Sequence, residues 1–169
     1  MPIERTLIIL KPDAVKRKLC GKIISVFEDA GLDIIAAKFF TPPKELLNKH
    51  YSCAPEYIES LGRKNLGASA DKAACMKQGQ IVYDRLMDYI TGGVMAMVLS
   101  GNEAVAIVRK LCGTTNPAAA DPATIRGKYC MDSYDLSNAE KRACHNLMHA
   151  SGTADEAAFE ISLWFPELS

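Results

Sequence analysis

The sequence predicts an α+β domain in which helices cover an antiparallel sheet, with a partly helical excursion inserted between two of the strands. Two observations predict this class. Short runs of branched apolar residues, too short for helices, recur along the chain. Between them lie segments whose apolar residues fall three and four positions apart, as in amphipathic helices.

The first part of the chain predicts a strand, a helix and a second strand. Residues 6–10 form an apolar run that ends at Lys11-Pro12, which suits a buried strand. From residue 13 to residue 30 the apolar period is helical, with Asp13 as the expected N-cap and Gly31 as the expected stop. A second strand is predicted for residues 33–40, before two consecutive prolines.

The middle of the chain is less regular. A short helix is expected at about residues 43–51, and residues 52–93 predict a partly helical excursion. A further strand is predicted for residues 94–99. The helix that follows is expected to be capped by Asn102 and ended by Gly113.

The last third predicts a long loop at residues 114–129, a second polar excursion at 133–142 and a short strand at 147–149. Thr153 and Glu156 match the capping box of a final amphipathic helix. The core order is then βαββαβ, the ferredoxin-like sandwich, in one domain spanning residues 1–169. Because many unrelated activities use this arrangement, the fold alone does not define the function.

Composition excludes several classes of protein. The formal net charge is zero, which gives no electrostatic reason to expect nucleic acid or a membrane surface as a partner. No apolar run approaches the length of about 20 residues that a membrane span needs. None of the six cysteines forms a C-x-x-C pair, so a protein-bound metal is not expected. Free thiols and the lack of a signal-like segment predict a cytoplasmic protein.

His149 is a candidate nucleophile, because a neutral imidazole attacks well near neutral pH and the free side chain has a pKa of about 6.5. Glu160, about three helical turns further on, can accept the proton of one ring nitrogen and orient the ring. Ser151 can link the two side chains. Each residue alone has an ordinary alternative, a histidine bonded to backbone or a solvated glutamate.

Lys11, Arg109 and Arg126 are separated cations near the ends of predicted elements, as phosphoryl transfer requires. Thr115 and Asn146 add neutral donors suited to phosphate or ribose hydroxyls. The alternative is a scatter of surface cations. Neither the P-loop pattern nor the Rossmann pattern of glycines is present, so those nucleotide sites are not expected.

Four separated segments, taken in order, resemble nucleoside diphosphate kinases: residues 4–15, 108–117, 123–127 and 146–151. Glu160 and the run at residues 163–165 also match the family. The combination is far more specific than any one of these segments. It implies a kinase that transfers the terminal phosphate of a nucleoside triphosphate to a nucleoside diphosphate through a phosphohistidine, in a ping-pong cycle.

The resemblance also implies roles for individual residues. His149 matches the phosphorylated histidine, and Glu160 and Ser151 match its supporting network. The residues matched to nucleotide contacts are Lys11, Tyr51, Arg109, Thr115, Arg126 and Asn146. Mg2+ is expected to arrive with the nucleotide rather than in an all-protein cage. Assembly as a homo-oligomer, either hexamer, tetramer or dimer, is expected.

Some positions depart from the family pattern. Ala150 and Ala123 stand where glycine is usual, and no proline precedes Val94. Gly152 stands where many members have an aspartate that can orient metal-bound water. The excursion at residues 52–93 replaces the segment that carries the base-stacking aromatic residue, so the sequence does not identify that residue.

Two other hypotheses remain open at this point. The departures are also typical of a paralogue that binds nucleotides or acts as a scaffold without catalysis, although the complete set of site residues argues against this. An RNA-binding module can share the same order of elements. Such a module needs exposed aromatic residues on its central strands, where this chain has Leu7, Ile9, Val94 and Val98.

Overall fold

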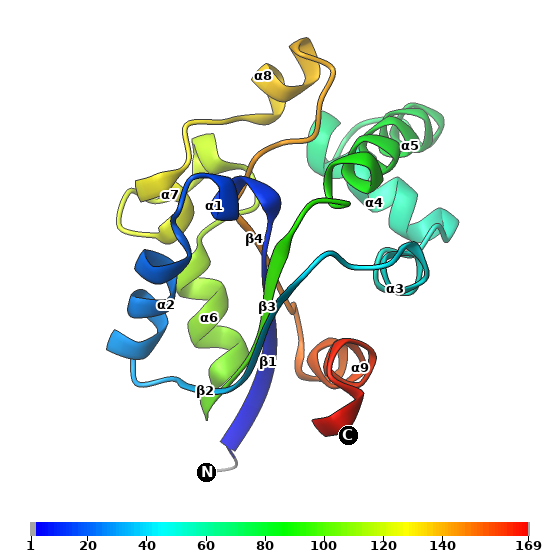
Figure 1. Cartoon of the computed structure of the whole chain (residues 1–169). Helices are drawn as coiled ribbons and strands as arrows, with labels where there is room; N and C mark the ends of the chain where they lie inside the picture. Colours follow the sequence, from blue (N-terminus) through cyan, green and yellow to red (C-terminus); the bar gives the residue numbers. More distant parts are fainter. Residues whose placement is uncertain (1–2, 169) are drawn as a thin grey trace.

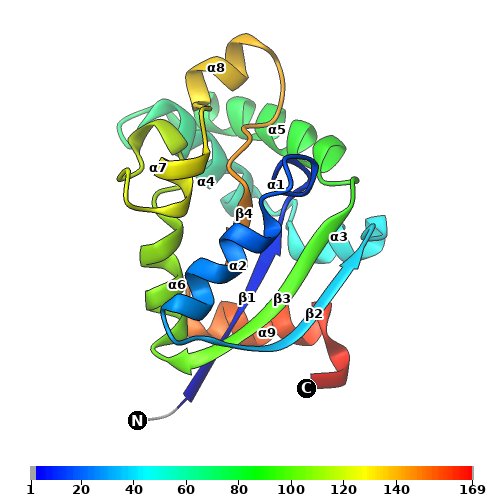
Figure 2. The same cartoon turned by 60° about the vertical axis from the view of Figure 1, so that its left-hand side comes forward.

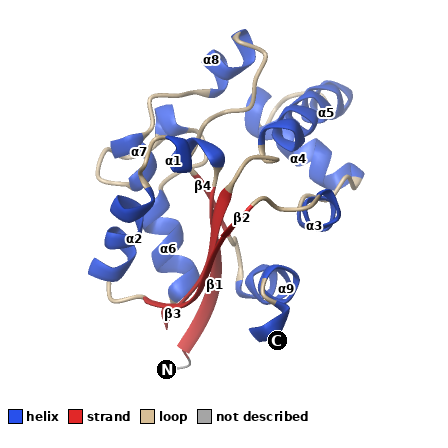
Figure 3. Ribbon diagram, in the orientation of Figure 1, coloured by secondary structure: helices blue, strands red, loops and turns tan. Residues whose placement is uncertain are grey.

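The computed structural model describes residues 3–168. Its centre is a four-stranded sheet in the order β2-β3-β1-β4, in which every neighbouring pair is antiparallel. The strands are β1 (Ile3–Leu10), β2 (Asp33–Phe40), β3 (Val94–Asn102) and β4 (Met148–Ala150). This is the strand order of the ferredoxin-like arrangement, so the predicted fold class is confirmed (Figure 3).

Helices cover both faces of the sheet (Figures 1 and 2). On one face lie α2 (Cys20–Asp29) and α6 (Ala104–Cys112). On the other lie α3 (Lys44–His50) and α9 (Ala154–Trp164). The sheet is therefore the middle layer of a sandwich.

The central strand β1 is buried on both sides. Successive strand side chains point to opposite faces. Leu7 and Ile9 accordingly pack into the core beneath α9, whereas Ile8 and Leu10 pack into the core beneath α2 and α6. All four are fully buried, and each contributes about 1.5–3 kcal/mol to stability by leaving water. The polar groups that follow β1 and β4 are thereby held on a rigid support.

The remaining elements are α1 (Pro12–Lys16), α4 (Pro55–Leu66), α5 (Lys72–Tyr89), η1 (Pro117–Ala119), α7 (Ile125–Tyr129), α8 (Tyr134–Ala139) and η2 (Pro166–Leu168). Helices α4 and α5 form a hairpin at one end of the sheet, and α8 lies above it in Figure 1. The excursion predicted as partly helical is thus mostly helical. The predicted long loop contains η1 and the short helix α7.

The single helix predicted for residues 13–30 is wrong. The chain forms α1 and then α2, because Lys18 adopts a left-handed φ of +57° between them. Asp13 does not cap a helix: α1 begins at Pro12, and the Asp13 carboxylate bonds to Tyr89 and Leu147 instead. These partners are far away in the sequence, which is why local capping rules did not anticipate the result.

The predicted cap at Asn102 is also wrong. Strand β3 continues through Asn102, and α6 begins at Ala104 after Glu103, whose φ is +48°. The N–H of Val105 instead donates to the carboxylate of Glu4, from β1, at 3.3 Å. A tertiary contact therefore satisfies the helix end that a local side chain was expected to satisfy. The stops predicted at Gly31 and Gly113 are correct, since both residues have positive φ at a helix end: Gly31 follows the C-cap Ala30 of α2, and Gly113 is itself the C-cap of α6.

Helix α9 is attached to the sheet by Lys38 of β2. Its ammonium donates to the carbonyl of Trp164 at the end of α9 and lies 4.4 Å from the centre of the Phe165 ring. A cation favours the C-terminal end of a helix because of the helix dipole.

Within residues 3–168, no helix combines the length and the apolar character that crossing a membrane requires.

Candidate active site

His149 lies on β4, at the edge of the sheet, opposite Ile9 of β1. The strand is short, and its pairing continues where the N–H of Ser151 donates to the carbonyl of Leu7 at 3.2 Å. The chain then turns into α9, where the hydroxyl of Thr153 accepts the N–H of Glu156 at 3.1 Å. This is one half of the predicted capping box; the Glu156 carboxylate accepts the N–H of Gly152 rather than that of Thr153. This turn brings Glu160 back over His149.

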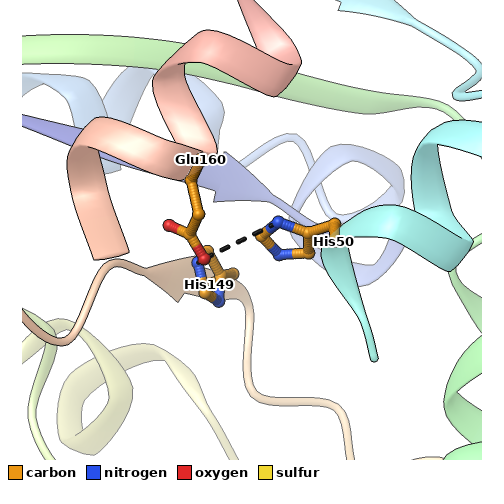
Figure 4. Close-up of side chains that lie close together, drawn as sticks. All are labelled: His50, His149 and Glu160. Atoms are coloured by element: carbon orange, nitrogen blue, oxygen red, sulfur yellow. Dashed lines mark ion pairs between the residues drawn. The ribbon is translucent and has the colours of Figure 1, made fainter. Parts of the chain in front are cut away.

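The carboxylate of Glu160 orients the His149 ring (Figure 4). Its Oε1 lies 2.8 Å from His149 Nε2. The distance is that of a hydrogen bond, but the ring N–H is not well aligned with the oxygen, so the pair is a close contact rather than an ideal bond. The carboxylate favours a proton on Nε2, which leaves the lone pair of Nδ1 free.

Ser151 holds the other oxygen of Glu160. Its hydroxyl donates to Glu160 Oε2 at 2.6 Å and accepts the N–H of Leu7 at 3.2 Å. Ser151 and Glu160 are 0% and 4% exposed, so this network is shielded from water. Burial raises the pKa of Glu160 above its usual value, while His50 and the Ser151 hydroxyl act in the opposite direction.

The electrostatics keep His149 neutral. Burial, followed by the nearby cations Lys11, Arg126 and Arg109, lowers its pKa from 6.5 to about 3. The carboxylate of Glu156 favours the charged form, but the loss of hydration is the larger effect. An unprotonated imidazole is the form that can attack an electrophile.

His50, at the end of α3, is the main functional neighbour that the sequence did not identify. Its ring meets the His149 ring edge to face at 4.5 Å, and its Nδ1 accepts the indole N–H of Trp164 at 3.1 Å. Figure 4 shows the Glu160 carboxylate next to both histidines. The three side chains each offer one ligand atom, all within 4.8 Å, as a metal site would require. However, Trp164 occupies His50 Nδ1 and so places the proton on Nε2, which suits orientation better than metal binding.

Asn146 connects the proposed nucleotide contacts. Its Oδ1 accepts from Lys11 Nζ at 2.8 Å, its Nδ2 donates to the carbonyl of Thr115 at 3.0 Å, and its carbonyl accepts from Arg126 Nε at 3.0 Å. Burial, followed by the nearby Arg126, lowers the pKa of Lys11 from 10.5 to about 8. The pKa of Lys11 therefore lies close to neutral pH.

Arg126, on α7, is a buried cation that holds the loops in place. Besides Asn146, it donates to the carbonyls of Gly113 and Met148, each at 2.7 Å. These bonds use three of the five N–H groups of a guanidinium, so two remain for a ligand. Burial lowers the pKa of Arg126, but a guanidinium remains charged at neutral pH.

A cavity of about 320 Å³ joins these groups. All of the predicted site residues except Ser151 line it, and Ser151 lies behind Glu160. Arg109 is exposed at its rim. The Tyr51 hydroxyl is buried and has no hydrogen-bond partner among the described residues, which leaves it available to a ligand.

Both excursions contribute to the cavity, which the sequence did not reveal. The residues that they add to its wall are Tyr57, Leu61, Lys64, Asn65, Val82, Leu86 and Tyr134, and Ala143 and Cys144 follow directly after the second excursion. Asn138 of α8 joins the excursions, since it donates to Asn65 of α4 at 2.9 Å and accepts from Gln78 and Arg85 of α5 at 3.1 and 3.2 Å.

At Gly152, where an aspartate was expected from the resemblance, a carboxylate from another position lies nearby. The Gly152 N–H donates to Glu156 Oε2 at 2.6 Å, and a Cβ at position 152 would lie 2.5 Å from that oxygen. The carboxylate of Glu156 therefore fills the space that a side chain at position 152 would enter. Glu156 also lines the cavity.

The fold and the site together define an enzyme of the phosphoryl-transfer class. A neutral, oriented histidine lies in a cavity with Lys11, Arg109 and Arg126, and positioned cations are what the transfer of a charged phosphoryl group needs.

Comparison with known proteins gives the family. The sequence profile of the family described as nucleoside diphosphate kinase matches residues 4–57 and 68–169. A nucleoside diphosphate kinase from Pyrobaculum aerophilum is 46% identical over 178 residues, covering 99% of this chain and 97% of the relative. One from Methanocaldococcus jannaschii is 38% identical, covering 97% and 94%. The chain belongs to the nucleoside diphosphate kinase family and is a phosphotransferase.

Solved structures agree with this assignment. The crystal structure of an NDP kinase from Pyrobaculum aerophilum superposes with a TM-score of 0.87 at 42% identity, covering 97% of this chain and 96% of that one. A transition-state mimic of nucleoside-diphosphate kinase from Borrelia burgdorferi, with bound vanadate and ADP, gives a TM-score of 0.80 at 34% identity, covering 96% and 87%. Residues 58–67 of this chain, which the family profile does not match, fall within and just after α4.

Proposed function

We propose that this chain transfers the terminal phosphate between nucleotides in a ping-pong cycle through a phosphohistidine at His149. The observation that carries the proposal is the pairing of His149 with Glu160, which leaves Nδ1 as the attacking atom of a neutral ring. The domain responsible spans residues 1–169, with the inserted excursion at residues 52–93.

In the first half-reaction, Nδ1 of His149 attacks the terminal phosphorus of a nucleoside triphosphate. A nitrogen–phosphorus bond forms, the bond to the bridging oxygen breaks, and the nucleoside diphosphate leaves with that electron pair. The second half-reaction reverses these steps with another diphosphate as acceptor. As charge moves onto the ring, Glu160 stabilises the positive charge at Nε2, as the orienting acid of a catalytic triad does.

The other site residues bind and orient the phosphates and sugar. Lys11, Arg109 and Arg126 neutralise the phosphate oxygens, and Thr115 and the Tyr51 hydroxyl donate hydrogen bonds. Asn146, held by Lys11, contacts the sugar. The Borrelia relative was captured with vanadate and ADP as a transition-state mimic, which supports phosphoryl transfer involving a nucleoside diphosphate in this fold.

Magnesium is proposed to enter with the nucleotide, held chiefly by the phosphates, whose charge it neutralises. The residues present fit this arrangement, because the cavity wall offers the hard oxygens that Mg2+ and its waters prefer. Glu156 is the carboxylate closest to the position that usually orients metal-bound water, and we assign that role to it.

The experiment that tests the function is an intact-mass measurement after incubation with magnesium ATP and removal of nucleotide. We expect one acid-labile phosphate on the wild type, discharged by GDP, and none on His149→Ala. His145→Gln is the matched control, since His145 does not line the cavity, and it should retain the phosphate. Folded wild type that gains no phosphate would refute the proposal and favour a nucleotide-binding paralogue without catalysis.

The structure does not support the RNA-binding alternative, which needs exposed aromatic residues on the central strands. Leu7, Ile9, Val94 and Val98 are all fully buried beneath helices, so the central strands present no exposed aromatic surface within residues 3–168.

We also propose that copies of the chain associate, and that the β2 edge takes part. Among residues 3–168 this strand pairs only with β3, and it exposes Ile35 (39%) and Phe39 (61%) along an open edge. Phe39→Lys should therefore reduce the mass measured by light scattering after size exclusion. The control is Phe159→Lys, which changes a similarly exposed phenylalanine (58%) on α9 and should leave the mass unchanged.

The cytoplasmic location stays a prediction from the sequence.

A further inference from the structure

A strained turn lies directly before the strand that carries His149. The N–H of Met148 donates to the carbonyl of Asn146 at 2.8 Å, which closes a turn around Leu147. Leu147 has a φ of +68° and is fully buried. A three-residue turn with positive φ at its centre is rare and strained, and a bulky residue stays in it only where its surroundings hold it there.

Both backbone groups of Leu147 are held by residues that follow β1. Its N–H donates to Asp13 Oδ2 at 3.0 Å, and its carbonyl accepts the N–H of Lys11 at 2.8 Å. Asp13 is only 6% exposed, so water does not compete strongly for its carboxylate. The strained turn thus depends on a buried carboxylate 134 positions earlier in the sequence.

Tyr89, the last residue of α5, holds this carboxylate in turn. Its hydroxyl donates to Asp13 Oδ1 at 2.5 Å and accepts the N–H of Asp13 at 2.8 Å. The Tyr89 ring also stacks on His145, just before the turn, with ring centres 5.1 Å apart. The helical excursion is therefore connected to the catalytic strand through a hydrogen-bonded chain.

The turn decides where two site residues stand, since Asn146 precedes Leu147 and His149 follows two residues later. We propose that Asp13 is a positioning residue for phosphoryl transfer at His149, and that Tyr89 of the excursion acts through it. The inference rests on the proposed function of His149. It assigns to the excursion a part in the chemistry as well as in the cavity wall.

The test measures the single-turnover rate of His149 phosphorylation at saturating magnesium ATP, per folded molecule, so that binding and stability do not contribute. Asp13→Ala should slow this rate about tenfold or more, because displacement of the reacting group by even about 1 Å is costly. Asp13→Asn should recover most of the rate, since an amide oxygen still accepts the Leu147 N–H.

A double variant separates positioning from independent effects. Tyr89→Phe alone should slow phosphorylation less than Asp13→Ala. The combination should be no slower than Asp13→Ala alone, because Tyr89 acts through Asp13. Tyr129→Phe, at a half-buried tyrosine that ends α7, is the matched control and should not change the rate.

The outcomes distinguish the two proposals. Wild type that gains no phosphate would refute the proposed function. Phosphorylated wild type with an equally fast, folded Asp13→Ala would overturn the positioning role. Should Asp13→Ala not fold, the comparison of Tyr89→Phe with Tyr129→Phe decides: a slower Tyr89→Phe supports the role, and equal rates overturn it.

Discussion

The residues around His149 work through burial as much as through charge. His149 and Lys11 are both removed from water, and burial lowers the pKa of each, to about 3 and about 8. The effects on function are opposite, because a histidine must lose its proton to attack whereas a lysine must keep its proton to bind phosphate. As far as these two groups are concerned, the activity should therefore persist further into acid pH than into alkaline pH.

The pKa of Lys11 predicts the alkaline limit of activity. Since the amine is charged below its pKa and neutral above it, kcat/KM, which reports the free enzyme, should fall as the pH rises through about 8. Bound phosphate favours the charged amine, so the limit in kcat should lie higher. Lys11→Arg should lower the rate but remove this limit, because a guanidinium stays charged. A wild-type kcat/KM that stays flat well above this pH would contradict the assignment.

Substitution of Ser151 measures how much its hydrogen bond to Glu160 contributes to the rate of His149 phosphorylation. Ser151→Ala removes a hydrogen bond to a buried carboxylate, a contact worth about 1.5–3 kcal/mol. We expect phosphorylation of His149 to slow by about tenfold or more, with the loss largest at acid pH, where Glu160 protonates more readily. Ser162→Ala is the control on the same helix, because that hydroxyl is exposed and bonds to the Phe159 carbonyl. Equal rates for both variants would remove Ser151 from the network.

At the scale of elements, glycines decide how the excursion packs. A Cβ at Gly79 of α5 would lie 1.9 Å from the Ile58 carbonyl oxygen of α4, and one at Gly62 of α4 would lie 1.9 Å from the Cys75 oxygen of α5. The two helices therefore approach each other through reciprocal glycine contacts. Alanine at either position must push them apart.

Gly79→Ala should lower the free energy of unfolding by about 1–3 kcal/mol, the usual cost of overpacking. Because α4 and α5 carry part of the cavity wall, the KM for nucleotide should rise as well. Gly21→Ala in α2 is the matched control: its Cβ would meet nothing within 4 Å, and helix propensity alone should stabilise the protein by about 0.5–1 kcal/mol. Thermal melts of the two variants should therefore shift in opposite directions.

At the scale of the whole molecule, His149 and the residues proposed to act with it are carried by the sheet and the helices packed on it, whereas two excursions form part of the cavity wall. Asn138 is the polar contact that joins them. Removing it should loosen the wall without moving the sheet. Binding and chemistry should then respond separately.

Asn138→Ala should raise the KM for nucleotide several-fold, by about 1 kcal/mol for lost hydrogen bonds, with little change in kcat. Steady-state kinetics with a nucleoside triphosphate and diphosphate pair measures both. Asp135→Ala, at an exposed position of the same helix, should change neither. A fall in kcat at constant KM would show that the excursions act on the chemistry through another route.

Some structural features follow from the local sequence, and others do not. The strand that ends at Leu10, the stops at Gly31 and Gly113 and the cap at Thr153 follow local rules, and the structure has them. The helix break at Lys18 and the start of α6 do not, because tertiary contacts override local preference there. The predicted site residues gather in one region, although their roles stay predictions.

The sequence by itself determined the fold class, the family and the set of candidate site residues, because strand and helix periods and short motifs are local properties of the chain. Only the tertiary structure placed His50, bonded to Trp164, beside His149, filled the space at Gly152 with Glu156, and joined Asp13 to Tyr89 and Leu147. These contacts link residues that are distant in sequence or depend on how a turn folds back. Their energies come from burial and geometry that arise only when the chain has folded.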